Sequence, residues 1–113
     1  MATADDLRRL ALALPGTVET PHFDRRAFKA DRIYATLAPD GLSANVRLEP
    51  DEQAFRCETN PNAYTAIPNA WGAQGWTGVV LAELDPAELE TVLRGAWQGY
   101  GVKLRKTGKS RTG

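Results

Sequence analysis

Two tryptophans stand five residues apart in the segment Ala70-Trp71-Gly72-Ala73-Gln74-Gly75-Trp76-Thr77. Each indole ring is large and needs cover from other side chains, and the two glycines permit a tight backbone turn between the rings. The apolar run Val79-Val80-Leu81 follows directly. We therefore expect a loop that leads into a central strand, residues 76–84, and anchors that strand in the core. The segment has no acidic or basic side chain, so it indicates fold rather than chemistry.

The length and composition favour one globular domain. A chain of 113 residues can bury its own core, and a hydrophobic share of 42% is ordinary for such proteins. Cys57 is the single cysteine, which excludes an internal disulfide and a zinc site built on cysteines, so we expect a cytoplasmic protein. No apolar run approaches the ~20 residues of a membrane-spanning helix, and we expect no membrane segment.

The net charge is zero but unevenly distributed. Residues 103–113 hold five basic side chains and no acidic one, whereas residues 1–102 hold nine basic and fourteen acidic side chains, a net charge of −5. We expect residues 1–102 to fold as a single domain and residues 103–113 to form a flexible basic tail. Such a tail either contacts a polyanion or only helps to keep the protein in solution.

Three segments have the signals of amphipathic helices. Thr3 and Asp6 have the spacing of a capping box, and an apolar stripe follows them until Pro15-Gly16. Residues 50–60 begin with proline and two acidic residues, which is typical of a first helical turn. Asp85-Pro86 gives the third helix its capping residue and its first helical position.

Between residues 18 and 48 the apolar period is two, which is typical of antiparallel strands with one buried and one polar face. Asp40-Gly41 is a turn signal between two alternating runs. The alternation assigns Ile33 to the buried face and Tyr34 to the polar face. The predicted order is α-β(3)-α-β(2)-α, and an additional short strand near residues 18–23 is left open.

Candidate catalytic groups are few. His22 is the only histidine, and no serine, cysteine or carboxylate is placed by sequence to form a triad or a metal cluster with it. Cys57 is interpreted as a small buried side chain rather than a nucleophile. Residues 72–75 lack the ending and the following helix of a phosphate-binding loop. We therefore predict a protein that is not an enzyme and has no metal site and no cofactor.

A basic cluster on the predicted sheet is the more suggestive feature. Its polar face and hairpin ends collect five cations, a tyrosine and an amide, at Arg25, Arg26, Lys29, Arg32, Arg47, Tyr34 and Asn45. Cations suit contacts with phosphates, and aromatic and amide side chains suit contacts with bases. Lys103, Arg105 and Lys106 of the tail extend this candidate set. The alternative is a solvated face with ion pairs to Asp24 and Asp31.

The order of these landmarks resembles the MmcQ/YjbR family of small bacterial proteins. The resemblance covers about residues 4–102, and it is carried by residues 11–16, Pro21-His22-Phe23, residues 27–37, residues 61–68, Gly75-Trp76-Thr77 and the closing helix at 85–100. It implies a two-layer α+β domain with helices on one face of an antiparallel sheet, similar to the secretion-chaperone-like fold. It also implies DNA binding through hairpins, and it supplies no catalytic residues.

Two functions of different classes remain. The first is weak, non-specific DNA binding through the basic polar face and hairpins of the sheet. The alternative is a protein- or peptide-binding module that uses a groove near Trp71 and Trp76 or adds a strand to a sheet edge. A continuous positive stripe would favour nucleic acid, and an exposed apolar patch would favour a protein partner. The oligomeric state stays open.

Overall fold

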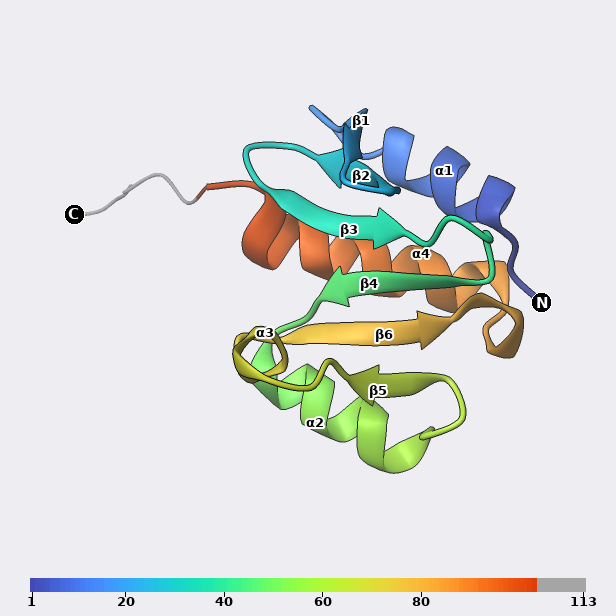
Figure 1. Cartoon of the computed structure of the whole chain (residues 1–113), viewed down its shortest axis with the longest axis vertical. Helices are drawn as coiled ribbons and strands as arrows, with labels where there is room; N and C mark the ends of the chain where they lie inside the picture. Colours follow the sequence, from blue (N-terminus) through green and yellow to red (C-terminus); the bar gives the residue numbers. More distant parts are fainter. Residues whose placement is uncertain (104–113) are drawn as a thin grey trace.

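The computed structural model describes residues 1–103, which form a two-layer α+β fold (Figure 1). Six antiparallel strands make one sheet in the order β1-β2-β3-β4-β6-β5. Their bounds are Val18–His22 for β1, Arg25–Lys29 for β2, Ile33–Leu37 for β3, Ser43–Arg47 for β4, Tyr64–Ala66 for β5 and Trp76–Val80 for β6. The predicted fold class is confirmed, and the strand left open near residue 18 is present as β1.

Four α-helices accompany the sheet within the described residues. They are α1 at Ala4–Leu12, α2 at Pro50–Thr59, α3 at Ala70–Ala73 and α4 at Pro86–Ala96. A 3-10 turn at Leu81–Glu83 precedes α4, and a wider π-helical turn at Trp97–Gly101 follows it. None of the helices among residues 1–103 has the length and apolar content needed to cross a bilayer.

The helix starts are those that local sequence signals predict. The Thr3 hydroxyl accepts a hydrogen bond from the Asp6 amide at 3.2 Å, and the Asp6 carboxylate accepts one from the Thr3 amide at 3.0 Å. The Asp85 carboxylate accepts a hydrogen bond from the Glu88 amide at 2.8 Å, with a proline in the first turn of α4. These contacts satisfy backbone donors that have no partner inside the helix.

The core lies between the sheet and the layer formed by α1 and α4, which pack against each other behind it (Figure 1). Its fully buried side chains come from both layers and include Leu7, Phe28, Val46, Leu89, Val92 and Leu93. Each such side chain contributes roughly 1.5–3 kcal/mol by leaving water. Helices α1 and α4 cover one face of the sheet only, and they leave its other face uncovered (Figure 1).

A β-bulge between β2 and β3 corrects one prediction. The register shifts after Phe28, so Tyr34 is an extra residue without a partner on β2. Tyr34 therefore turns to the helix side and is fully buried, while Ile33 takes the opposite face. The hydroxyls of Tyr34 and Thr17 hydrogen-bond at 2.8 Å, and the Tyr34 hydroxyl lies 3.3 Å from the Ala11 carbonyl oxygen, to which it can donate. The placement of Tyr34 on the polar face was wrong.

Helix α2 lies alongside β5, and Arg56 of α2 links it to β5 and α4 through polar contacts (Figure 1). It has no fully buried residue; Phe55 is 63% exposed and Cys57 is only partly buried. The Arg56 guanidinium contacts the Tyr64 hydroxyl at 3.2 Å and the Glu88 carboxylate at 3.3 Å. The Tyr64 hydroxyl donates to Glu88 at 2.5 Å, and burial together with this bond raises the pKa of Tyr64.

Candidate functional site

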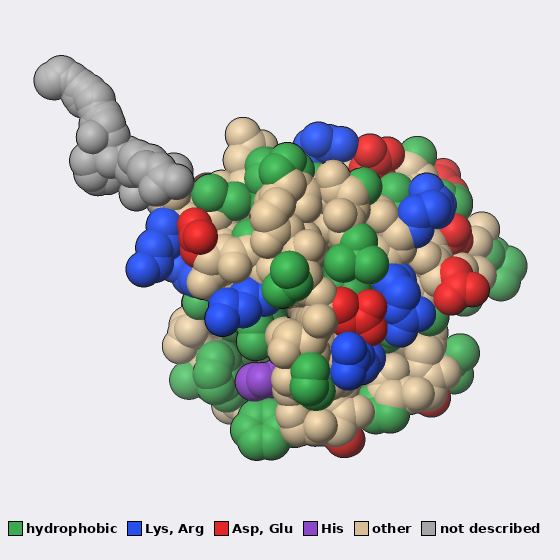
Figure 2. All heavy atoms as spheres, turned by 90° about the horizontal axis from the view of Figure 1, so that it is seen from above, with side chains coloured by type: hydrophobic (Ala, Val, Ile, Leu, Met, Phe, Trp, Pro, Cys, Tyr) green, Lys and Arg blue, Asp and Glu red, His purple; other side chains and the backbone are tan. Residues whose placement is uncertain are grey.

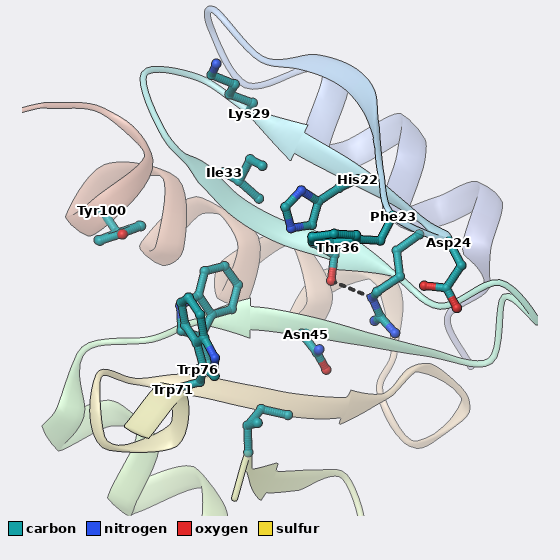
Figure 3. A pocket seen from close by; sticks show the side chains of 12 residues that line it. His22, Phe23, Asp24, Lys29, Ile33, Thr36, Asn45, Trp71, Trp76 and Tyr100 are labelled. Carbon is teal, nitrogen blue, oxygen red and sulfur yellow. Dashed lines mark hydrogen bonds between the residues drawn. The ribbon is translucent and has the colours of Figure 1, made fainter. Parts of the chain in front are cut away.

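A hollow of about 760 Å³ opens on the sheet face that α1 and α4 leave uncovered (Figure 3). It is lined by His22, Phe23, Asp24, Arg25, Lys29, Ile33, Thr36, Asn45, Ile67, Trp71, Trp76 and Tyr100. We refer to this site as the hollow. Its volume lies within the roughly 300–1,000 Å³ of pockets that bind small ligands.

Small side chains explain why this face is hollow. One row of paired residues crosses all six strands, and its members are Thr20, Ala27, Thr36, Asn45, Gly78 and Thr65. None of these side chains is bulky, so the side chains of the strands leave space above the middle of this face. Thr36 and Asn45 give the floor a hydroxyl and an amide, which can each donate and accept hydrogen bonds.

The turn between β1 and β2 forms one rim of the hollow. His22 pairs with Arg25, so Phe23 and Asp24 make a two-residue hairpin turn. Phe23 has φ of 59°, whereas Asp24 has no positive φ, and this combination is typical of a type II′ turn, which favours glycine at the first position. The Phe23 ring is nevertheless 93% exposed and lies edge-on to the His22 ring at 4.8 Å.

Helix α3 carries Trp71 and forms the facing rim, and Trp76 at the start of β6 lies beside it, across the hollow from Phe23 (Figure 3). Trp71 is 58% exposed, so the expectation that both indole rings are covered was wrong for this one. The predicted loop is a short helix that starts at Asn69, whose side chain accepts a hydrogen bond from the Trp71 amide at 2.8 Å. Asn69 itself has φ of 90°.

The rim that carries Trp71 is fixed from below. A Cβ on Gly72 would lie 1.8 Å from the Ile67 carbonyl oxygen, so only glycine allows this close approach. The Gln53 amide of α2 donates to the carbonyl oxygens of Gly72 at 3.0 Å and Trp76 at 3.2 Å. The exposed indole therefore stands on an ordered support.

Arg25 carries positive charge into the hollow. Its Nε donates to the Thr36 hydroxyl at 2.9 Å, shown by the dashed line in Figure 3. One terminal nitrogen, Nη2, is buried without a hydrogen-bond partner in the part of the chain that the structure describes. A buried donor without a partner is unfavourable, and an anionic ligand would supply the missing acceptor.

Tyr100 gathers two further guanidinium groups at the edge of the hollow. The Cζ atoms of Arg32 and Arg47 lie 4.8 Å and 4.5 Å from the centre of its ring, and Trp76 meets the same ring edge-on at 6.3 Å. Arg47 also contacts Glu49 at 3.4 Å. Cation–π contacts of this kind hold the guanidinium groups in place without neutralising their charge.

Most arginines among residues 1–103 contact a carboxylate, whereas the cations that line the hollow do not. Within residues 1–103, six arginines contact a carboxylate, at positions Arg8, Arg9, Arg26, Arg47, Arg56 and Arg94. The cations of this part of the chain that have no such partner are Arg25, Lys29, Arg32 and Lys103. Two of these line the hollow and Arg32 borders it through Tyr100, so cations without an ion-pair partner are concentrated at this site, which the Asp24 carboxylate also lines.

The side chains within residues 1–103 form no cluster of three or more His, Cys, Asp or Glu that could hold a metal ion. His22 lies at the surface beside hydrophobic side chains (Figure 2). That the protein is not an enzyme and has no cofactor stays a prediction.

The comparisons with known proteins agree with the fold. The family model named YjbR matches residues 12–99. The chain belongs to the YjbR family. It is also similar to the crystal structure of Deinococcus radiodurans protein DR2400, family-model domain DUF419, with a TM-score of 0.78 and 24% identity over 98% of this chain and 84% of that one. No curated protein matches the sequence.

In this YjbR-family chain, some of the residues predicted to bind nucleic acid lie at the hollow and others do not. Arg25, Lys29 and Asn45 line the hollow, and Arg32 and Arg47 border it. These five residues are brought together, as predicted, and whether they contact a nucleic acid stays a prediction.

Arg26 does not belong to the group. Its register partner Leu37 faces the core, and its Nε contacts the Glu19 carboxylate at 2.9 Å, which also pairs with Arg8 of α1. Arg26 therefore lies on the helix side of the sheet, because neighbouring residues of a strand point to opposite faces. Its placement on the same polar face as Arg25 was wrong.

Of the three candidate residues in the tail, the structure describes Lys103 alone. Lys103 is exposed, and its backbone amide donates to the Asp31 carboxylate at 2.7 Å. Arg105 and Lys106 lie outside the described residues. Tyr34 is buried in the core and so does not line the hollow.

Sequence reasoning missed the aromatic rim at Phe23. A signal was present, because Pro21-His22-Phe23-Asp24 joins two strands through a two-residue turn with an aromatic residue where glycine is favoured. Ile33 was also missed, and only the bulge moves it to this face.

Proposed function

We propose that the protein binds nucleic acid through the hollow and its rim. The observation that carries the proposal is the concentration of unpaired cations at a site that also exposes aromatic rings. Phosphates require cations that are free to contact them, and bases contact aromatic and amide side chains. Arg25, Lys29 and Arg32 supply the charge, while Phe23 and Trp71 supply the rings.

The net charge of the chain limits the affinity that we expect for nucleic acid. Residues 1–102 carry a net charge of −5, so long-range attraction to a polyanion is weak outside the hollow. We expect non-specific binding with a dissociation constant in the micromolar range or weaker at physiological salt, and tighter binding at low salt.

A charge-removal experiment tests the proposal. Labelled oligonucleotides are titrated with the full chain at two salt concentrations, and binding is followed by fluorescence anisotropy. The triple variant Arg25→Gln, Lys29→Gln, Arg32→Gln should weaken binding at least about tenfold and reduce the salt slope, since up to three phosphate contacts are lost. Arg26→Gln is the matched control for Arg25→Gln alone, because each removes one charge and Arg26 lies on the helix side of the sheet.

The possible outcomes separate the interpretations. Loss of affinity in the triple variant with parental affinity in Arg26→Gln supports the proposal. Equal losses in Arg25→Gln and Arg26→Gln would show that net charge alone causes the effect. No binding of the parent at low salt would reject nucleic-acid binding altogether.

A peptide-binding module is the second candidate, and the exposed rings of Phe23 and Trp71 favour it. The strands β1 and β5 are also the two edges of the sheet, where an extended peptide could add a strand. This function predicts that apolar peptides displace a hydrophobic dye from the hollow and that salt has little effect. Such a result, together with no oligonucleotide binding, would favour it over the first.

A further inference from the structure

The aromatic side chains of the hollow face a solvent-filled space rather than the core. Phe23 and Trp71 stand on facing rims and are mostly exposed, and Trp76 and Tyr100 complete the lining beside Trp71 (Figure 3). Large exposed rings are uncommon on a domain surface, and a group of them around one hollow indicates a binding site.

Backbone strain accompanies both exposed rings. Among residues 1–103, Phe23 and Asn69 are the non-glycine residues with positive φ, and Asn69 caps the helix that carries Trp71. Such a conformation is unfavourable for a residue other than glycine and persists where the surroundings or a function require it. At Phe23 the strain is not offset by burial, because 93% of the residue is exposed. The ring therefore contributes little buried area to the turn beyond its edge-on contact with the His22 ring.

The chemistry of the hollow distinguishes single strands from duplexes. A ring can stack on a base only where the base face is free, and in a duplex both faces are covered by neighbouring base pairs. The hydroxyl of Thr36 and the amide of Asn45 lie on the floor between the rims, where the edges of an unpaired base are within reach of hydrogen-bonding groups. Arg25 lies beside this floor, where it hydrogen-bonds to Thr36, and Lys29 lines the hollow farther along β2, so that both can contact phosphates (Figure 3).

We propose that the hollow binds single-stranded nucleic acid, with unpaired bases stacked on Trp71 and Phe23 and the phosphates held by Arg25 and Lys29. This inference rests on the proposed function and specifies its substrate class. It differs from duplex docking on the hairpins, in which the phosphates alone would face the protein and the aromatic rings would have no partner.

A comparison of strands is the first test. The full chain is titrated with a labelled single strand of about 12 nucleotides, a length within the span of known single-strand sites, and with the duplex of the same sequence. The single strand should bind at least about tenfold more tightly at equal salt. Quenching of tryptophan fluorescence should accompany its binding and should be much smaller in Trp71→Phe.

Ring-removal variants form the second test. Trp71→Ala should weaken single-strand binding about tenfold, as the loss of one base–aromatic stack does, and Trp71→Phe should restore most of it. Phe55→Ala is the matched control, since Phe55 is similarly exposed but lies on α2 and does not line the hollow. The control should bind like the parent.

The variant Phe23→Gly separates a role of the ring in ligand binding from a role in stability. Glycine suits the positive φ at this turn, so the urea midpoint of the variant should equal or exceed that of the parent. Its affinity for the single strand should nevertheless fall about fivefold to tenfold. A variant that folds as well and binds less would show that the ring serves the ligand.

Failure of this inference differs from failure of the proposed function. Equal or tighter duplex binding with no effect of Trp71→Ala and Phe23→Gly would overturn the single-strand inference while nucleic-acid binding stands. Binding to neither probe would reject both.

Discussion

Trp97 illustrates how one residue joins distant segments. It follows α4 directly and is partly buried against the core. Its indole Nε1–H donates to the Pro15 carbonyl oxygen at 2.9 Å, and this bond connects the end of α4 to the turn after α1. A half-buried tryptophan with a satisfied N–H contributes both apolar area and one hydrogen bond.

Replacing this side chain should destabilise the fold measurably. Trp97→Ala should lower the free energy of unfolding by about 3 kcal/mol, at the low end for large aromatic truncations because the ring is partly exposed. Trp97→Phe keeps most of the packing but loses the hydrogen bond, and should cost about 1 kcal/mol. Urea unfolding measures both. A parental midpoint for the alanine variant would contradict the packing of Trp97 against the core.

At the scale of elements, Glu19 connects α1, β1 and β2. Its carboxylate contacts Arg8 of α1 and Arg26 of β2, each at 2.9 Å. The hydrogen bond from Arg8 is the main cause of the lowered pKa of Glu19, and that from Arg26 adds to it, while partial burial acts in the opposite direction. Both arginines are substantially exposed, so salt weakens the pairs.

The lowered pKa predicts a pH dependence of stability with a defined sign. The folded state favours the ionised carboxylate, so its contribution is present above about pH 4.5, the ordinary value, and is lost as pH falls through the lower pKa of the folded state. Glu19→Gln should therefore be less stable than the parent at pH 7, with the difference shrinking towards pH 2–3.

Urea unfolding at pH 7 and at pH 2.5 measures this difference. Glu83→Gln, at an exposed residue of the turn before α4, is the control and should change little at either pH. A Glu19→Gln defect of the same size at both pH values would contradict the electrostatic explanation.

At the scale of the whole molecule, charge is divided between an acidic body and a basic C-terminal segment. Residues 104–113 contain four basic side chains and no acidic one. Diffuse attraction by this segment would add to binding of any nucleic-acid sequence, whereas the hollow would set the preference for single strands.

Removing residues 104–113 should separate these two contributions. Affinity should fall for single strand and duplex by similar factors, and the salt slope should become shallower by up to about 3 for single strands, since at most four phosphate contacts are lost. Anisotropy titrations over a series of salt concentrations measure the slope. A variant of full length with the four basic residues changed to glutamine should behave like the deletion; parental binding in either variant would show that the segment takes no part.

Local sequence signals were sufficient for most of the secondary structure. Thr3 with Asp6, Pro50 and Asp85-Pro86 each begin a helix, and Asp40-Gly41 separates two strands, with φ of 75° at Gly41. These features depend on residues within one turn of the chain, which is why the sequence alone determines them. The family resemblance added the two-layer arrangement, which the structure (Figure 1) and its similarity to the solved DUF419 domain confirm.

The composition of the hollow was decided only by the tertiary structure. Alternation assigned Ala35, Leu37, Ala44 and Val46 correctly to the buried face, but the bulge after Phe28 exchanged the faces of Tyr34 and Ile33. The same sheet places Arg25 and Arg26 on opposite faces, and it brings the hairpin turn opposite Trp71 although they are far apart in sequence. Register and strand order result from packing between distant segments, and no local pattern carries that information.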